Sequence, residues 1–80
     1  MNKEEITRII ESTLTSGNKT PGLFDLPKIM AIKMKLQSCQ SVTDVLAVID
    51  EYRDLISKAF GLNEGAIDLA VDKIKLLEGK

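Results

Sequence analysis

The sequence predicts an all-α fold, most simply a compact four-helix bundle formed by a single domain over residues 1–80. In four separate segments, apolar residues recur at spacings of three and four, the period of an amphipathic helix. No segment alternates apolar and polar residues with a period of two, so no strand is expected. Hydrophobic residues at 44% and charged residues at 29% are typical of a globular chain. At this length a partner subunit would add useful stability.

The first helix is predicted to follow Asn2, which forms a capping box with Glu5. Gly17 and Asn18 are expected to end it. One apolar stripe runs along this segment and comprises Ile6, Ile9, Ile10, Thr13 and Leu14.

The loop over residues 15–24 is predicted to be the only long one. Pro21 and Gly22 suit the centre of a type II turn, because glycine tolerates the positive φ that this turn requires. We expect Leu23 and Phe24, which follow directly, to fold back onto the core.

The second helix is predicted over residues 25–39, with Pro27 in its first turn, where a missing N–H is tolerated. One apolar face consists of Ile29, Ile32, Leu36 and Cys39. A neighbouring apolar face consists of Leu26, Met30 and Met34, and much of the remaining surface is filled by Lys28, Lys33 and Lys35. This apolar coverage is wider than one core requires.

The third helix is predicted to run unbroken from Ser41, its N-cap, to Gly61, which stops it. Its stripe comprises Val42, Val45, Ile49, Tyr52, Ile56 and Ala59. The fourth helix is predicted from Asn63 to about Glu78. Its main face comprises Ile67, Ala70, Val71, Ile74 and Leu77, and a second face comprises Leu62, Ala66, Leu69 and Leu76.

The residue inventory argues against an enzyme. The chain has no histidine, so His-dependent triads and imidazole metal ligands are excluded. Cys39 is its single cysteine, and its place on an apolar face near a helix C-terminus predicts a buried thiol rather than a nucleophile. A small bundle is also expected to leave no room for a pocket of about 300 Å³. We therefore predict no catalytic residue and no cofactor.

Two polar motifs are interpreted as ordinary surface. The segment Gly17-Asn18-Lys19-Thr20 lacks the adjacent Gly-Lys pair and the earlier glycine of a phosphate-binding loop. The carboxylates Glu64, Asp68 and Asp72 are spaced by four, but helical spacing alone does not build a cation cage. We predict no metal site, and we expect these carboxylates to face solvent or a partner.

The charge distribution favours a protein partner over nucleic acid. The net charge is −1; residues 1–40 hold six basic and four acidic side chains, and residues 41–80 hold five and eight. The chain has no tryptophan and few aromatic residues for base stacking, so direct nucleic-acid binding is disfavoured. No apolar run could cross a bilayer, and none resembles an export signal. With a free thiol, this predicts a cytoplasmic protein without membrane association.

These observations predict a small non-enzymatic module that binds a protein partner or a second copy of itself, as an adaptor or inhibitor would. More apolar surface lies on the second and fourth helices than an 80-residue monomer can hide, and such patches mark interfaces. The predicted partner-binding residues are Leu26, Met30, Met34, Leu62, Leu69, Leu76, Lys28, Lys33 and Lys35.

Two family resemblances leave alternatives open. The elements Met34-Lys35-Leu36, Cys39-Gln40-Ser41-Val42 and Val48-Ile49-Asp50 resemble the haemolysin-expression modulators, which implies a regulator that docks onto a nucleoid-structuring protein. The family's aromatic-rich C-terminal part has no counterpart here.

The length, the acidic balance, the opening helix Glu4–Ile10 and the segment that Ser41 opens resemble acyl carrier proteins. That resemblance implies Ser41 as the attachment point of a phosphopantetheine arm. The family's Asp-Ser pair is Gln40-Ser41 here, and its long first loop is replaced by the helical segment over residues 25–39.

Overall fold

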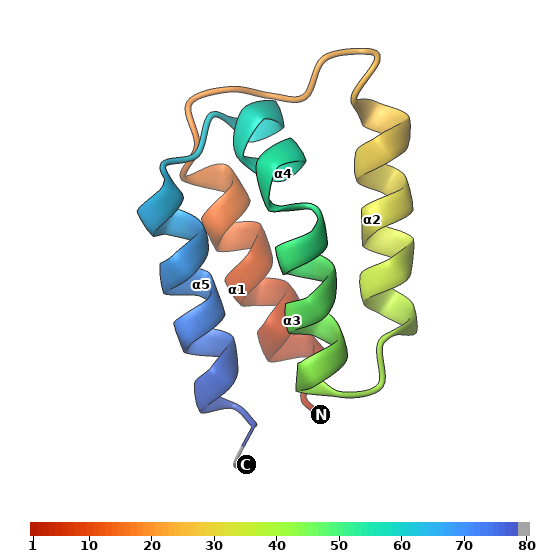
Figure 1. Ribbon diagram of the computed structural model, residues 1–80, viewed down its shortest axis with the longest axis vertical. Helices are drawn as coiled ribbons and strands as arrows, with labels where there is room; N and C mark the ends of the chain where they lie inside the picture. Colours follow the sequence, from red (N-terminus) through yellow and green to blue (C-terminus); the bar gives the residue numbers. More distant parts are fainter. Residues whose placement is uncertain (79–80) are drawn as a thin grey trace.

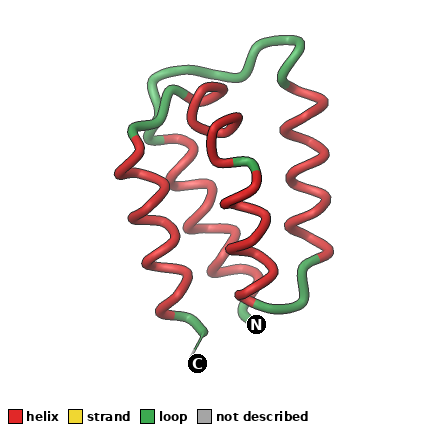
Figure 2. Tube along the Cα trace, viewed as in Figure 1, coloured by secondary structure: helices red, strands yellow, loops and turns green. Residues whose placement is uncertain are grey.

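The computed structural model describes residues 1–78, and for Glu64 only the backbone. Every regular element of the described residues is an α-helix and none is a strand, which confirms the predicted all-α class. Five helices are present rather than four (Figures 1 and 2). They are α1 (Lys3–Thr15), α2 (Leu26–Ser38), α3 (Val42–Glu51), α4 (Arg53–Phe60) and α5 (Glu64–Leu76). No described helix combines the length and the apolar character needed to cross a bilayer.

Side-chain caps fix two of the helix starts where the sequence predicts them. The Asn2 side chain accepts a hydrogen bond from the Glu5 N–H at 3.1 Å, and Ser41 Oγ accepts one from the Asp44 N–H at 3.1 Å. Each bond satisfies one of the N–H groups that a helix leaves unpaired at its start. Ser41 therefore has a structural role at the start of α3.

The prediction of one continuous helix over residues 41–60 is wrong, because the helix bends at Tyr52. This residue has φ −107° and ψ 15°, outside the helical region. The hydrogen bonds from Tyr52 N–H to Val48 O and from Ile56 N–H to Tyr52 O remain, at 3.1 and 2.9 Å. The bend contains neither proline nor glycine, and the apolar stripe runs through it, so the sequence pattern gives no sign of it.

The bend separates two hydrophobic clusters. Around α1, α3 and α5 the buried residues are Ile6, Cys39, Val42, Val45, Ile49, Ile67 and Ile74. Between α2 and α4 they are Ile29, Ile32 and Ala59. Leu36, Val48 and Ile56 pack against both clusters and so join them into one core.

The helices form a bundle that is open along one side. Helix α5 packs on α1, α3 and α4, whereas α2 lies beside α3 and packs its buried Ile29 and Ile32 against α4. Helix α2 runs antiparallel to α1 and stands at the edge of the molecule (Figure 1). No comparably extensive helix contact closes the side between α1 and α2.

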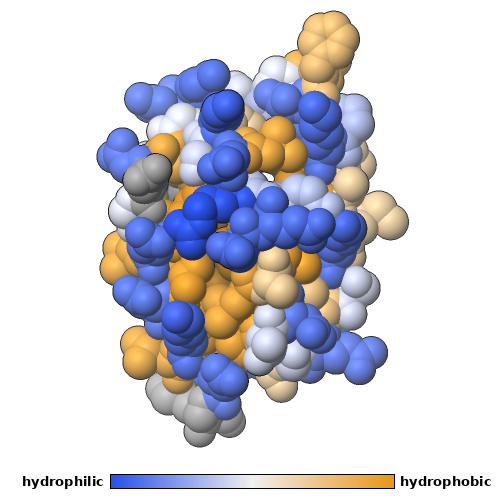
Figure 3. All heavy atoms as spheres, in the orientation of Figure 1, coloured by the Kyte–Doolittle hydropathy of each residue, from blue (hydrophilic) through white to orange (hydrophobic). Residues whose placement is uncertain are grey.

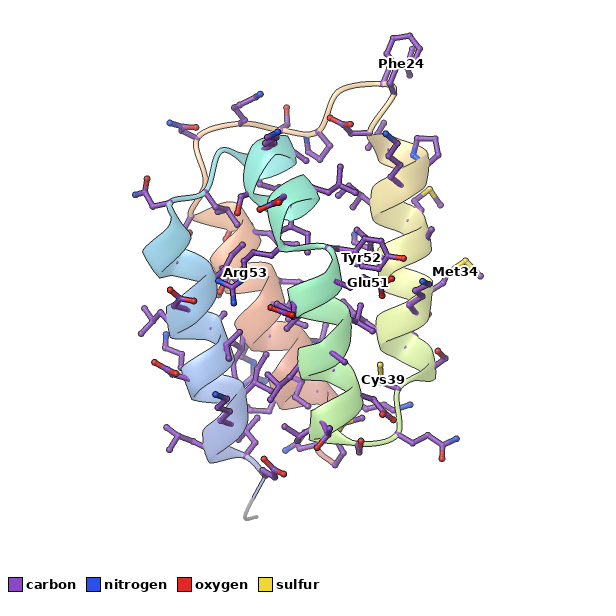
Figure 4. The ribbon with its side chains drawn as sticks, viewed as in Figure 1. Phe24, Met34, Cys39, Glu51, Tyr52 and Arg53 are labelled. Atoms are coloured by element: carbon purple, nitrogen blue, oxygen red, sulfur yellow. The ribbon has the colours of Figure 1, made fainter. Side chains whose placement is uncertain are left out.

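The loop between α1 and α2 is anchored at one end and projects at the other. The Lys19 N–H donates to Phe60 O at 3.1 Å, and Gly17 lies so close to Phe60 O that a Cβ there would overlap it. Leu23 and Phe24 do not fold back onto the core as predicted. Phe24 is 89% exposed and projects from the end of the molecule (Figure 4).

The turn at Pro21 and Gly22 also differs from the prediction. Among the glycines that the structure describes, Gly61 alone has a positive φ, so Gly22 does not occupy the positive-φ position of a type II turn. The Gly22 carbonyl instead accepts from the N–H groups of Asp25 and Leu26 at 3.0 and 3.1 Å. This turn leads directly into α2 and keeps Leu23 and Phe24 away from the body.

Candidate functional site

An apolar groove of about 630 Å³ lies between α1 and α2. The prediction that this bundle leaves no room for a pocket near 300 Å³ is wrong. That expectation concerned the interior of a small bundle. Here the side between α1 and α2 is open, and the core side chains behind it form the floor of the groove.

The floor and walls of the groove are hydrocarbon. Ile29 and Ile32 of α2, Val45 and Ile49 of α3 and Ile67 of α5 line it as members of the core. Further apolar lining comes from Ile10, Leu14, Leu36, Ile56, Phe60, Leu62 and Ala70. All five helices thus contribute, so the groove depends on the whole fold rather than on one segment.

Polar side chains lie along the two edges of the groove. Lys3, Thr7 and Glu11 come from α1, and Lys33 and Gln37 come from α2. The Lys3 ammonium donates a hydrogen bond to Gln37 O at 3.0 Å, which bridges the two helices where α1 begins and α2 ends. The groove is therefore bridged at this end and has a charged residue on each edge.

Beside the groove, α2 carries an exposed apolar stripe. We define the α2 stripe as Leu26, Met30 and Met34, spaced by four residues along one side of the helix. Met30 is 64% exposed and Met34 69% exposed, and Met34 points away from the bundle (Figure 4). The structure thus places these three predicted partner-binding residues together on the surface.

The three predicted lysines of α2 have different surroundings. Lys33 lines the groove, and Lys28 is exposed on the surface of α2. Lys35 donates a hydrogen bond to Tyr52 Oη and lies 4.9 Å from the centroid of that ring. The hydrogen bond to Tyr52 raises the pKa of the Lys35 ammonium. Lys35 therefore ties α2 to the bend between α3 and α4.

The residues predicted on the fourth helical segment do not form one surface. Leu69 and Leu76 are exposed on α5, and Leu76 is 74% exposed. Leu62 precedes α5, is partly buried against the main core and lines the groove. Leu62 thus belongs to the lining of the groove and not to the exposed face of α5.

An ion pair involves part of the predicted acidic stripe. Arg53 of α4 donates to Asp68 of α5 at 2.7 Å and lies 3.9 Å from Asp50 of α3. The Arg53 side chain points toward α5 (Figure 4), and a hydrophilic band crosses this face of the molecule (Figure 3). The side chain of Glu64 lies outside the described part. Among described residues, no group of three His, Cys, Asp or Glu side chains is arranged to hold a metal.

Cys39 is buried in the main cluster, as predicted. Its thiol donates to Lys35 O at 3.2 Å. Burial raises the pKa of the thiol, with a smaller contribution from the nearby Asp44 carboxylate. Both effects disfavour the thiolate, the form that a nucleophilic cysteine needs.

The groove is the feature that sequence reasoning missed. The surplus of apolar surface on α2 was the available signal, but it gave no indication that α1 and α2 would stay apart. Comparison with protein-family models, curated proteins and solved structures finds no match to this chain.

Proposed function

We propose that this protein is a non-catalytic protein-binding module whose groove receives an amphipathic helix of a partner. The observation that carries this proposal is the open apolar groove between α1 and α2, with a hydrocarbon floor and polar edges. Docking of an apolar helix face into such a groove is a recurring mode of peptide recognition.

The size of the groove suits one face of a short helix. A cavity of about 150 Å³ holds one benzene-sized group. The groove has a volume of about 630 Å³ and so takes about four large apolar side chains. Helices α1 and α2 each have 13 residues, a length of about 20 Å. A partner helix of three to four turns matches that length and presents about one large side chain per turn.

The chemistry of the lining favours binding over catalysis. The ionisable lining residues are Lys3, Glu11 and Lys33, all on the edges, and the floor is hydrocarbon. The Cys39 thiol is not among the lining residues. Edge charges of this kind orient a partner and set the register of docking.

Site-specific photo-crosslinking in the cells that make the protein tests this proposal. A benzophenone amino acid replaces Thr7 or Gln37 on the groove edges, and in matched controls it replaces Asp54 or Asp72 away from them. We expect the groove positions to crosslink to one amphipathic helix, identified by mass spectrometry of the crosslinked peptide. Equal crosslinking from all four positions, or none from the groove positions, would contradict the proposal.

The two family resemblances predict different results. An acyl carrier would show a mass increment on the peptide that contains Ser41. Ser41 is exposed, but its Oγ already accepts the capping hydrogen bond from Asp44. A haemolysin-expression modulator would crosslink to a nucleoid-structuring protein, which would identify the partner of the same binding module.

A further inference from the structure

We infer that the groove is filled by α2 of a second copy of this chain, in a two-fold symmetric dimer in which each α2 stripe enters the other protomer's groove. This inference rests on the proposed function, because it names the helix that the groove receives.

The chain itself carries a helix that fits the description of the partner. The α2 stripe presents Leu26, Met30 and Met34 at the spacing i, i+4, i+8, all exposed. Leu23 and Phe24, in the turn before the helix, extend this apolar surface and are also exposed. The stripe and the turn together supply the four or more large apolar side chains that the groove takes. Methionine suits such a role because its flexible side chain adapts to irregular surfaces.

The stripe and the groove share an edge. At about 100° per residue, Gln37 lies about 20° from Met30 around the helix axis, and Lys33 lies about 60° from it. Both Gln37 and Lys33 line the groove. The stripe therefore borders the α2 edge of the groove, and Lys33 and Gln37 lie between it and the apolar floor. With a two-fold axis beside α2, the stripe of each protomer covers the groove of the other. Both protomers then use the same surface, as an isologous interface requires.

The protomer exposes more surface than a folded chain of its mass is expected to expose. A folded chain of this mass is expected to expose about 4,800 Å². The protomer exposes 5533 Å², an excess of about 700 Å² over that expectation. A standard interface buries about 800 Å² on each partner. The excess is thus close to one side of a standard interface.

The charges on α2 are compatible with two α2 helices lying side by side. Lys28 and Lys35 are each about 140–160° from Met30 around the axis, so they point away from the partner. Lys33 lies on the α2 edge of the groove and Glu11 on the α1 edge. In the dimer, Lys33 of each protomer faces the partner's Glu11. This pairing of opposite charges fixes the register.

Sedimentation equilibrium on the purified full-length chain tests the dimer directly. We expect a dimer that the double substitution Met30→Glu/Met34→Glu weakens at least about 100-fold, because it places four carboxylates in an apolar interface. Both side chains are exposed, so circular dichroism should show that the variant keeps its helices. The matched control, Leu69→Glu/Leu76→Glu on the outer face of α5, should change the dissociation constant less than about threefold. A dimer that survives in the methionine variant, or that the control abolishes, contradicts the inference.

A charge exchange tests the register. The Lys33→Glu variant brings two carboxylates together at this contact, and the Glu11→Lys variant brings two ammonium groups together. Each variant alone should therefore have a dimer dissociation constant about tenfold higher or more. Mixing the two variants restores both opposite-charge pairs, and the heterodimer should regain most of the lost affinity. Equal affinities for the single variants and their mixture would exclude this register.

Crosslinking from Thr7 separates failure of the dimer from failure of the proposed function. If the wild-type chain is a dimer and the variant with the crosslinker at Thr7 links to residues 23–35 of a second copy, the dimer and the helix-binding groove are both supported. A monomer crosslinked from Thr7 to a helix of another protein overturns the dimer and supports the helix-binding groove. A monomer without any crosslink from Thr7 or Gln37 overturns both.

Discussion

Helices α2 and α5 are equally long and both rich in apolar residues, but they bury their side chains to different extents. Helix α5 packs against α1, α3 and α4 and buries Ile67, Ala70 and Ile74. Helix α2 packs against α3 and α4, buries Ile29 and Ile32, and leaves the two methionines of its stripe exposed. The helix with more neighbours thus buries more residues, although both helices keep large apolar side chains exposed, Leu69 and Leu76 in the case of α5. The exposed apolar side chains of α2 border the groove and form the candidate docking surface.

The largest loss of stability is expected from a substitution in α5. Ile74 is 0% exposed, and Ile74→Ala should lower the free energy of unfolding by about 2–5 kcal/mol, because it leaves a cavity in a closed part of the core. Urea unfolding followed by circular dichroism measures this. Leu76→Ala, at a residue 74% exposed on the same helix, is the matched control and should change stability by less than about 0.5 kcal/mol. Similar losses in both variants would mean that the faces of α5 are wrongly assigned.

The corresponding substitution in α2 should cost less. Ile32 is buried but lines the groove, so Ile32→Ala enlarges an existing void instead of opening a new one. We expect a loss of about 2 kcal/mol, near the lower limit for such substitutions. The comparison of Ile32→Ala with Ile74→Ala by urea unfolding sharpens the contrast between the two helices. A greater loss for Ile32→Ala would show that α2 is held as firmly as α5.

Two glycines of the loop between α1 and α2 should respond differently to alanine. At Gly17 a Cβ would overlap Phe60 O, so Gly17→Ala should destabilise the fold by about 1–3 kcal/mol as α4 and the loop move apart. At Gly22 nothing lies near the added methyl. Gly22→Ala should therefore be neutral or stabilise by up to about 1 kcal/mol. Melting temperatures of the two variants test this, and a harmless Gly17→Ala would refute the close approach.

The ion pair between α4 and α5 should contribute less. Arg53→Ala removes the contacts to Asp68 and Asp50 and should cost about 0.5–1 kcal/mol, because these side chains are partly or largely exposed. The loss should shrink at 1 M salt, where exposed charges are screened. Arg8→Ala removes a pair within α1 whose arginine is 74% exposed and serves as the control. It should change the urea midpoint very little.

The pH dependence attributable to Cys39 is expected to be the smallest effect. Because burial raises the pKa of this thiol in the folded state, the unfolded chain loses the thiol proton first as the pH rises. The contribution of Cys39 is therefore fully present below the unfolded thiol pKa and declines above it. Urea midpoints from pH 7 to 10 should fall more steeply for the wild type than for Cys39→Ala. Parallel curves would contradict the shift.

The sequence predicted the features that neighbouring residues determine. Asn2 and Ser41 cap their helices as expected, and Cys39 lies on a buried face. The bend at Tyr52 was not predictable, because the apolar stripe passes through it. Because large apolar side chains are usually buried, the sequence predicts Phe24 in the core. Its burial would need a surface within reach, and the turn at Gly22 directs the chain away from one.

The site was less predictable than the fold. The α2 stripe could be identified as surplus apolar surface from the spacing of Leu26, Met30 and Met34 alone. The groove could not, because it arises from the separation of α1 and α2, two helices that the sequence pattern cannot place relative to each other. The sequence pattern likewise puts Leu62 on the second apolar face of the last helix, and only the fold places it in the groove.

The limited support of α2 also has a consequence for how the molecule moves. A helix packed on two neighbours can detach at a lower free-energy cost than one packed on three, and such local openings govern amide hydrogen exchange. We expect the amides of α2 to exchange with deuterium sooner than those of α5, as one cooperative group. The Lys3–Gln37 and Lys35–Tyr52 contacts would break in the same event. The helix proposed to bind a second copy is thus also the first to come loose, so association should slow its exchange more than that of any other helix.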